Sequence, residues 1–254
     1  MSAPVMLRRW LVSSDPRAMH VLMCPFAGAS SNAFRDWQQL GDAGIDVSLA
    51  VYPGRDQRMQ EPCASDIGAL ADMLVAALSA YTPAARQPLV LVGHSMGAQV
   101  AFEACLRLER CGTPPRALIL SACHAPHLRA RRLLSGLDDQ DFLQQLQHIG
   151  GTHSELLRDS TLMAAFLPML RADFGATEAY QRACTSDRTR LRTPTLLLCG
   201  STDKEALPAE VSAWQEWLND TVTPVPVQIS GDHFYVTRYP RAVITQILQH
   251  FHFG

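Results

Sequence analysis

Lysine is nearly absent from this chain of 254 residues, in which Lys204 is the single lysine. The other basic residues are arginines scattered along the sequence, and the formal net charge is −2. Proteins that bind nucleic acids or anionic membranes usually concentrate positive charge in one segment or on one face. The sequence has no such concentration, and we therefore expect neither kind of partner.

Paired cysteines and long apolar runs are also missing. The seven cysteines are odd in number and lack the CxxC spacing of a zinc site. Several lie in apolar runs such as LLLCG, where a free thiol behaves as a small apolar side chain. No apolar run approaches the roughly 18 residues of a membrane span, and the WLV after Arg8-Arg9 is too short for a signal peptide. We expect a protein of the reducing cytosol.

Uninterrupted apolar runs alternate with segments of helical periodicity over most of the chain, and 47% of its residues are hydrophobic. Such runs are typical of strands buried on both faces of a parallel sheet. Their alternation with helices predicts an α/β fold with a doubly wound, mostly parallel sheet. The expected strands are 20–26, 46–54, 88–93, 116–123, 193–200 and 225–231, and the expected helices are 67–81, 98–112, 209–218 and 240–251.

The segment 127–192 breaks this rhythm. It contains no convincing strand, but it has helix-like blocks: DDQDFLQQLQHIGG, SELLRD and STLMAAFLPMLRADF. A segment of this length between two strands is too long for an ordinary loop. We expect a small helical subdomain inserted between 1–126 and 193–254.

Ser95 lies in a GHSMG motif between the apolar run LVLV and the helical pattern AQVAFEACL. A G-x-S-x-G turn between a buried strand and a helix exposes the serine on a sharp turn, and the glycines prevent clashes around it. A serine hydroxyl also needs a base, an acid that orients the base, and N–H donors for the oxyanion. Ser95 is the candidate nucleophile.

Asp203 and His233 are the candidate acid and base. Each follows an expected strand, and in this type of fold the acid and then the histidine come after the serine in the chain. A helix-capping role for Asp203 is the simpler alternative, with Glu205 as the substitute acid. The CHAPH stretch at 123–127 lacks a second group of metal ligands, so we expect it at the rim of the active site and expect no metal.

The oxyanion hole requires two backbone N–H groups. Met96, directly after the nucleophile, is the expected source of one. The small, glycine-containing loop CPFAGASS after the first expected strand is the expected source of the other, with Phe26 as the candidate donor and Ala27 as the alternative. Cys24 precedes this loop but lacks the elbow context of a nucleophile.

Five motifs in order resemble those of one known family. CPFAGAS, YPGR at 52–55, GHSMGAQVAFE, LPMLRAD at 167–173 and GDHFY are similar to motifs of the α/β-hydrolase thioesterases, specifically the stand-alone type II thioesterases of nonribosomal peptide and polyketide synthesis. The resemblance covers nearly the whole chain. MCPFAG, CHAPHL and the elbow are most similar to thioesterases of siderophore synthetases of the pyochelin and yersiniabactin kind. Ala29 stands where many members have a second glycine.

The resemblance implies hydrolysis of stalled or mis-primed acyl and aminoacyl groups from the phosphopantetheine arm of acyl or peptidyl carrier protein domains. It implies no metal or organic cofactor, and a helical lid formed by 127–192; we expect a monomer. A lid-bearing esterase or lipase that acts on free esters shares the catalytic features. An acyltransferase fits the order of the acid and the histidine less well, and a catalytically idle carrier-binding subunit is the alternative from another functional class.

Overall fold

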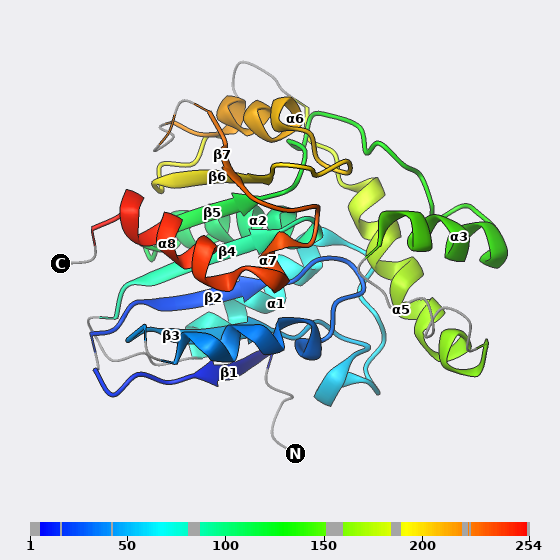
Figure 1. Ribbon diagram of the computed structural model, residues 1–254, viewed down its shortest axis with the longest axis horizontal. Coiled ribbons are helices and arrows are strands. Elements are labelled where there is room, and N and C mark those ends of the chain that lie inside the picture. Colours follow the sequence, from blue (N-terminus) through cyan, green and yellow to red (C-terminus); the bar gives the residue numbers. More distant parts are fainter. Residues whose placement is uncertain are drawn as a thin grey trace.

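The computed structural model describes residues 6–15, 17–41, 43–80, 87–150, 160–183, 189–219, 223 and 225–252, and the side chains of 160–162 fall outside this description. Its centre is a seven-stranded sheet in the order β1-β3-β2-β4-β5-β6-β7, in which only β1 runs antiparallel (Figure 1). The strands are β1 (Leu7–Leu11), β2 (His20–Cys24), β3 (Asp46–Ala50), β4 (Leu89–His94), β5 (Ala117–Ser121), β6 (Thr195–Gly200) and β7 (Val227–Ile229).

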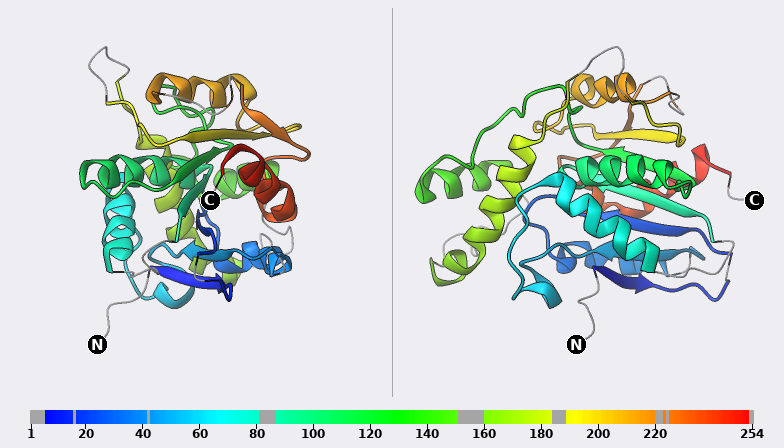
Figure 2. Two further views of the ribbon diagram at one scale, coloured as in Figure 1. Left: turned by 90° about the vertical axis from the view of Figure 1, so that its left-hand side faces the viewer. Right: turned by 180° about the vertical axis from the view of Figure 1, so that it is seen from behind.

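The expected mostly parallel, doubly wound sheet is confirmed. Every residue of β2, β3, β5 and β6 is buried, because helices cover both faces of the sheet. Helices α1 (Ile67–Ala80) and α2 (Met96–Arg110) lie on one face, and η1 (Ser31–Leu40), a 3₁₀-helical segment, lies with α8 (Pro240–His250) on the other (Figure 2). The expected helix at 209–218 is divided into α6 (Pro208–Ser212) and the 3₁₀ turn η3 (Ala213–Trp217).

Strand β1 and segment η1 were not predicted from the sequence, and neither were two shorter helical turns. Strand β1 lies at the edge of the sheet, where Arg8 and Arg9 are exposed, so it lacks the uninterrupted apolar pattern of the central strands. Segment η1 buries Phe34 and Trp37, and the Trp37 indole N–H donates to the Val236 carbonyl at 2.8 Å. The short η2 (Asp56–Arg58) and α7 (Tyr235–Arg238) complete the elements of the sheet domain.

Between β5 and β6 the described residues form α3 (Asp139–Ile149) and α5 (Ser160–Ala179), which lie beyond the carboxyl ends of the strands (Figure 1). The expected SELLRD helix at 154–159 lies outside the described residues. The two helices share a small hydrophobic cluster separate from the main core, formed by Leu134, Phe142, Leu146, Met163, Met169 and Leu170. No helix in the described ranges has the length and apolar character to cross a bilayer.

Candidate active site

Ser95 lies on a strained turn between β4 and α2. Its backbone has φ 55° and ψ −123°, in the region that non-glycine residues rarely adopt. The two flanking glycines allow this turn. A Cβ on Gly97 would lie 1.9 Å from the Cys24 carbonyl oxygen, and a Cβ on Gly93 would lie 2.3 Å from the Gly97 oxygen. The glycines of the motif are therefore required by close backbone contacts.

The structure brings the three predicted residues together in one hydrogen-bonded series. Ser95 Oγ lies 3.2 Å from His233 Nε2, and His233 Nδ1 lies 2.9 Å from Asp203 Oδ2. Asp203 and His233 are both buried. They arrive from the ends of neighbouring strands, because β6 and β7 pair in parallel with Gly200 opposite Ile229. The arrangement has the geometry of a serine nucleophile, a histidine base and an orienting carboxylate.

Asp203 is held in its ionised form. Burial alone would raise its pKa. The hydrogen bonds that it accepts from His233 and from the Ala206 and Glu205 amides outweigh burial, and they lower the pKa below its ordinary value. Asp203 Oδ1 accepts the Glu205 N–H at 2.8 Å and the Ala206 N–H at 3.1 Å. The alternative acid, Glu205, binds the Arg132 guanidinium instead, at 2.8 and 3.0 Å. Lys204, between the two carboxylates, is exposed.

The candidate oxyanion donors lie on two neighbouring segments: Phe26 is in the loop after β2, and Met96 is the first residue of α2. Cys24 is paired with Gly93 across β2 and β4, so the chain that leads to Phe26 leaves the sheet beside the elbow. In the part of the chain that the structure describes, neither the Phe26 N–H nor the Met96 N–H donates to another protein group. Two unengaged amides next to a serine hydroxyl are what an oxyanion requires. Their role, and the choice between Phe26 and Ala27, stay predictions.

His94 is a further residue of the site, and it is not a candidate for the base because it precedes Asp203 in the chain. It is fully buried, its Nε2–H donates to the His233 carbonyl at 2.7 Å, and its Nδ1 lies 2.8 Å from Ser121 Oγ. Burial first, and then the neighbouring charge of His233, lower the pKa of His94 to about 3. Ser121 also contacts the Tyr235 hydroxyl. The neutral His94 ring therefore anchors the backbone of the candidate base.

A cavity of about 110 Å³ opens onto Ser95, and it is lined by residues of the sheet domain and by residues of the helical segment between β5 and β6. Phe26 and His233 come from the sheet domain, whereas Phe174 and Thr177 come from α5. The rim predicted for the CHAPH stretch is present, since Cys123 and His124 also line this cavity. Among the described residues no three His, Cys, Asp or Glu side chains are grouped as potential metal ligands.

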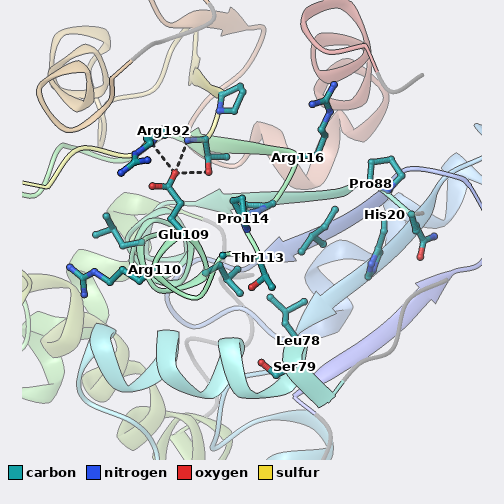
Figure 3. Close-up of a pocket in the computed structure, with 18 of the residues that line it drawn as sticks. His20, Leu78, Ser79, Pro88, Glu109, Arg110, Thr113, Pro114, Arg116 and Arg192 are labelled. Carbon is teal, nitrogen blue, oxygen red and sulfur yellow. Dashed lines mark hydrogen bonds between the residues drawn. The ribbon is translucent and has the colours of Figure 1, made fainter. Parts of the chain in front are cut away.

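A larger hollow, of about 1060 Å³, lies at the opposite, amino ends of the strands (Figure 3). It is open to solvent, and its lining includes His20 and Glu109. The Glu109 carboxylate accepts the backbone N–H groups of Arg192 and Thr193 at 2.8 and 2.6 Å, so it ties α2 to the chain before β6. The volume of a cavity does not identify the candidate active site here, because Ser95, His233 and Asp203 all lie at the other end of the sheet.

His20 is expected to make the stability depend on pH. Burial lowers the pKa of His20 from 6.5 to about 4, and the charge of Asp46, which raises the pKa, offsets only part of this effect. Ser48 Oγ lies 2.8 Å from His20 Nε2. Between those pH values the unfolded chain binds a proton there that the folded chain does not, so the unfolding free energy falls as the pH falls. The unfolding free energy, measured by urea denaturation at several pH values in this range, should fall as the pH falls. His20→Gln should reduce the slope of unfolding free energy against pH by the equivalent of up to about one bound proton. Ser48→Ala, which keeps the imidazole, should retain the slope, and equal slopes for His20→Gln and wild type would contradict the prediction.

Comparisons with known proteins point to one family. The thioesterase domain family matches residues 19–252. The chain is 41% identical over 228 residues to a probable anguibactin biosynthesis thioesterase of Vibrio anguillarum, and the match covers 89% of each chain. Its structure is similar to that of YbtT, a type II thioesterase from the yersiniabactin NRPS/PKS biosynthetic pathway, with a TM-score of 0.91, 47% identity, and coverage of 97% and 98% of the two chains. It is also similar to BorB, a type II thioesterase from the borrelidin biosynthetic cluster, with a TM-score of 0.82, 30% identity, and coverage of 98% and 99%.

Proposed function

This chain belongs to the thioesterase domain family and is a thioester hydrolase with the α/β-hydrolase fold, and from that premise we propose that its substrates are acyl groups on the phosphopantetheine arm of carrier proteins. The observation that carries the proposal is the match along almost the entire chain to type II thioesterases of NRPS/PKS pathways. The similarity to thioesterases of anguibactin and yersiniabactin synthesis favours editing of stalled acyl or aminoacyl groups in siderophore assembly.

In the proposed mechanism His233 transfers every proton. Its Nε2 takes the proton of the Ser95 hydroxyl as Oγ attacks the thioester carbonyl, and the Phe26 and Met96 N–H groups bind the resulting oxyanion. As the C–S bond breaks, His233 returns the proton to the thiolate, and the acyl group remains on Ser95. His233 then deprotonates a water that attacks the acyl-enzyme, and the carboxylic acid leaves as Ser95 regains its proton. Asp203 stays ionised and stabilises the imidazolium. These steps use this chain's residues, the substrate and water, without a metal or cofactor.

The helical segment 127–192 is proposed to act as a lid over the acyl group, with 1–126 and 193–254 forming the hydrolase core. Two observations support this. The segment has its own hydrophobic cluster, and α5 contributes Phe174 and Thr177 to the cavity at Ser95. A carrier domain must deliver its arm and leave, so movement of such a lid is part of the proposal.

The proposed partners are the acyl or peptidyl carrier domains of a synthetase, and the proposed active unit is a monomer. A reducing cytosol is the proposed compartment. All six cysteines that the structure describes are free thiols, which supports such an environment.

Hydrolysis of one acyl group on two carriers tests the substrate class. With the acyl group on a phosphopantetheinylated carrier domain, kcat/KM is expected to exceed that for the same acyl group on an aryl alcohol by at least about 100-fold, because only the carrier offers the arm and a docking surface. Equal values for the two substrates would support the esterase or lipase alternative. A fluorophosphonate probe that fails to label Ser95 in the folded wild-type protein would support the idle carrier-binding subunit.

A further inference from the structure

Helix α5 carries a buried carboxylate that reaches the loop after β2. The Asp173 side chain is 1% exposed, and its Oδ2 accepts the backbone N–H of Gly28 at 2.7 Å. Gly28 lies two residues after Phe26, the candidate oxyanion donor. The proposed mechanism gives Asp173 no role. It is nevertheless in direct contact with the loop on which that mechanism depends.

Arg55 completes the contact from the other side. Its guanidinium donates to both oxygens of Asp173, at 2.8 and 2.7 Å, and its Nη1 also donates to the Ala29 carbonyl at 3.3 Å. The side chain of Arg55 is only 4% exposed. Burial of two charges costs desolvation that their attraction often fails to recover, so such a pair is poor evidence of added stability. Its bidentate geometry does, however, fix the position of the carboxylate closely.

The loop that Asp173 contacts is a tight turn. The Ala29 N–H donates to the Phe26 carbonyl at 3.1 Å, and Gly28, at the third position, has φ +77°, which is the signature of a type II turn. The Gly28 N–H belongs to the central peptide of this turn. Type I and type II turns differ in the orientation of that peptide. By accepting the Gly28 N–H, the Asp173 carboxylate holds the central peptide in one of the two orientations.

Packing reinforces the same contact. A Cβ at Gly28 would lie 2.5 Å from Leu170 Cδ2, so α5 lies directly against the turn. Leu170 is one helical turn before Asp173, and both side chains therefore approach the loop from the same face of α5. Helix α5 and the turn at residues 26–29 are therefore in contact through the apolar side chain of Leu170 and through the charge-assisted hydrogen bond of Asp173.

We propose that Asp173 is a positioning residue that sets the orientation of the Phe26–Ala29 turn, so that the oxyanion hole is complete only while α5 is seated on the loop. This inference rests on the proposed function. The lid then has a second task besides covering the acyl group. Its contact with Gly28 makes hydrolysis depend on closure, and an acyl-carrier that has docked without closing the lid is not hydrolysed efficiently.

The kinetics distinguish this role from simple lid packing. The carbonyl oxygen is common to all thioesters, so a misplaced oxyanion donor lowers kcat equally for an acetyl and a long-chain substrate. Loss of lid packing instead raises KM for the long chain and has little effect on acetyl. Acetyl and decanoyl thioesters of pantetheine, assayed side by side, report the two effects separately.

The principal variant is the double substitution Arg55→Met with Asp173→Leu, compared with Asp173→Leu alone. The single variant leaves a buried, unpaired guanidinium and is expected to lower the melting temperature, whereas the double variant removes that charge and is expected to restore it. We expect kcat to stay lower than in wild type by about 10-fold or more in both, equally for the two thioesters. Recovery of kcat together with the melting temperature would mean that the pair is merely structural and would overturn the inference.

Tyr180→Phe is the matched control. The Tyr180 hydroxyl donates to Glu103 at 2.7 Å, and it anchors the chain just after α5 without touching the 26–29 turn. Its acetyl kcat is expected to stay within about 2-fold of wild type, and a fall equal to that of the double variant would show that any loosening of α5 has this effect and would overturn a specific role for Asp173.

Asp173→Asn keeps the shape of the side chain and tests the inference if the double variant does not fold. The amide NH₂ group faces Arg55 Nη2 in one orientation, and both Arg55 Nη1 and the Gly28 N–H in the other. Both orientations lose the bidentate pair that fixes the side chain, so we expect acetyl kcat to fall several-fold with unchanged KM. A folded Asp173→Asn protein with the acetyl kcat of wild type would overturn the inference. Failure of the proposed function looks different, because the wild-type enzyme itself would then leave carrier-bound thioesters intact.

Discussion

Replacement of Ser95 by alanine is expected to lower kcat for a carrier-bound thioester by roughly 10³- to 10⁶-fold, since groups of a serine–histidine–carboxylate unit act together. The substitution removes only the hydroxyl group, whose oxygen lies 3.2 Å from His233 Nε2. Alanine has the same steric limits as serine at the positive φ of this position, so the turn should form and the melting temperature should stay close to that of wild type. Steady-state kinetics and thermal unfolding measure the two expectations.

Two comparisons make the result specific. The double variant Ser95→Ala with His233→Ala should be no slower than Ser95→Ala alone, because the histidine has no hydroxyl to activate once the serine is gone. Ser79→Ala, which changes a serine of α1 whose hydroxyl donates to the Val75 carbonyl at 2.9 Å, should keep wild-type kcat. If Ser95→Ala retained full activity, or if the two losses multiplied in the double variant, the assigned nucleophile and base would be wrong.

Gly97→Ala is expected to have the second largest effect, on folding as well as on activity. The new Cβ would lie 1.9 Å from the Cys24 oxygen and 2.6 Å from the Pro25 oxygen, and both are backbone atoms at the end of a buried strand. Relief requires that α2 move away from β2, which costs at least several kcal/mol in a close-packed interior. The same movement separates Met96 from the Phe26 loop. We expect little folded protein, and a kcat at least about 100-fold lower in whatever folds.

Gly41→Ala provides the matched control for this steric argument. Gly41 has a helical φ of −56°, and the nearest atom to an added Cβ is the Gln38 oxygen at an ordinary 3.6 Å. The substitution should leave the unfolding free energy unchanged or raise it by up to about 1 kcal/mol, because alanine restricts the unfolded chain more than glycine does. Chemical denaturation of both variants tests the contrast. Wild-type stability in Gly97→Ala would show that the elbow tolerates a side chain there.

The sequence predicts the central sheet well because its strands are buried on both faces, and burial leaves uninterrupted apolar runs such as TLLLCG. That the three candidate catalytic side chains meet was predictable for a different reason. Ser95, Asp203 and His233 each follow a strand, and neighbouring parallel strands bring their carboxyl ends to one edge of the sheet. Chain order and strand ends therefore contained the essential geometry of the site.

Other features depend on contacts that leave no local signal. Strand β1 is amphipathic and charged, and it forms only because β3 offers an antiparallel edge. Arg55 and Asp173 are separated by 118 positions, and neither neighbourhood shows that the two side chains meet. His94 was recognised as part of the elbow, but its hydrogen bond to the His233 carbonyl depends on how the last loop folds back over β4. Family resemblance marked LPMLRAD as a motif without indicating what Asp173 touches.

The position of the single lysine, in the loop after β6 that carries Asp203, allows a fluorescent label to be placed beside the candidate active site. Lys204 is the single lysine of the chain, and it is exposed between the buried Asp203 and the Arg132-bound Glu205. The α-amino group is blocked first, near neutral pH, because α-amino groups ordinarily have a lower pKa than lysine side chains. An amine-reactive fluorophore added afterwards at higher pH would then label the protein at one position beside the candidate active site. Its emission and anisotropy would report, without any engineered cysteine, when a carrier domain arrives and when it leaves.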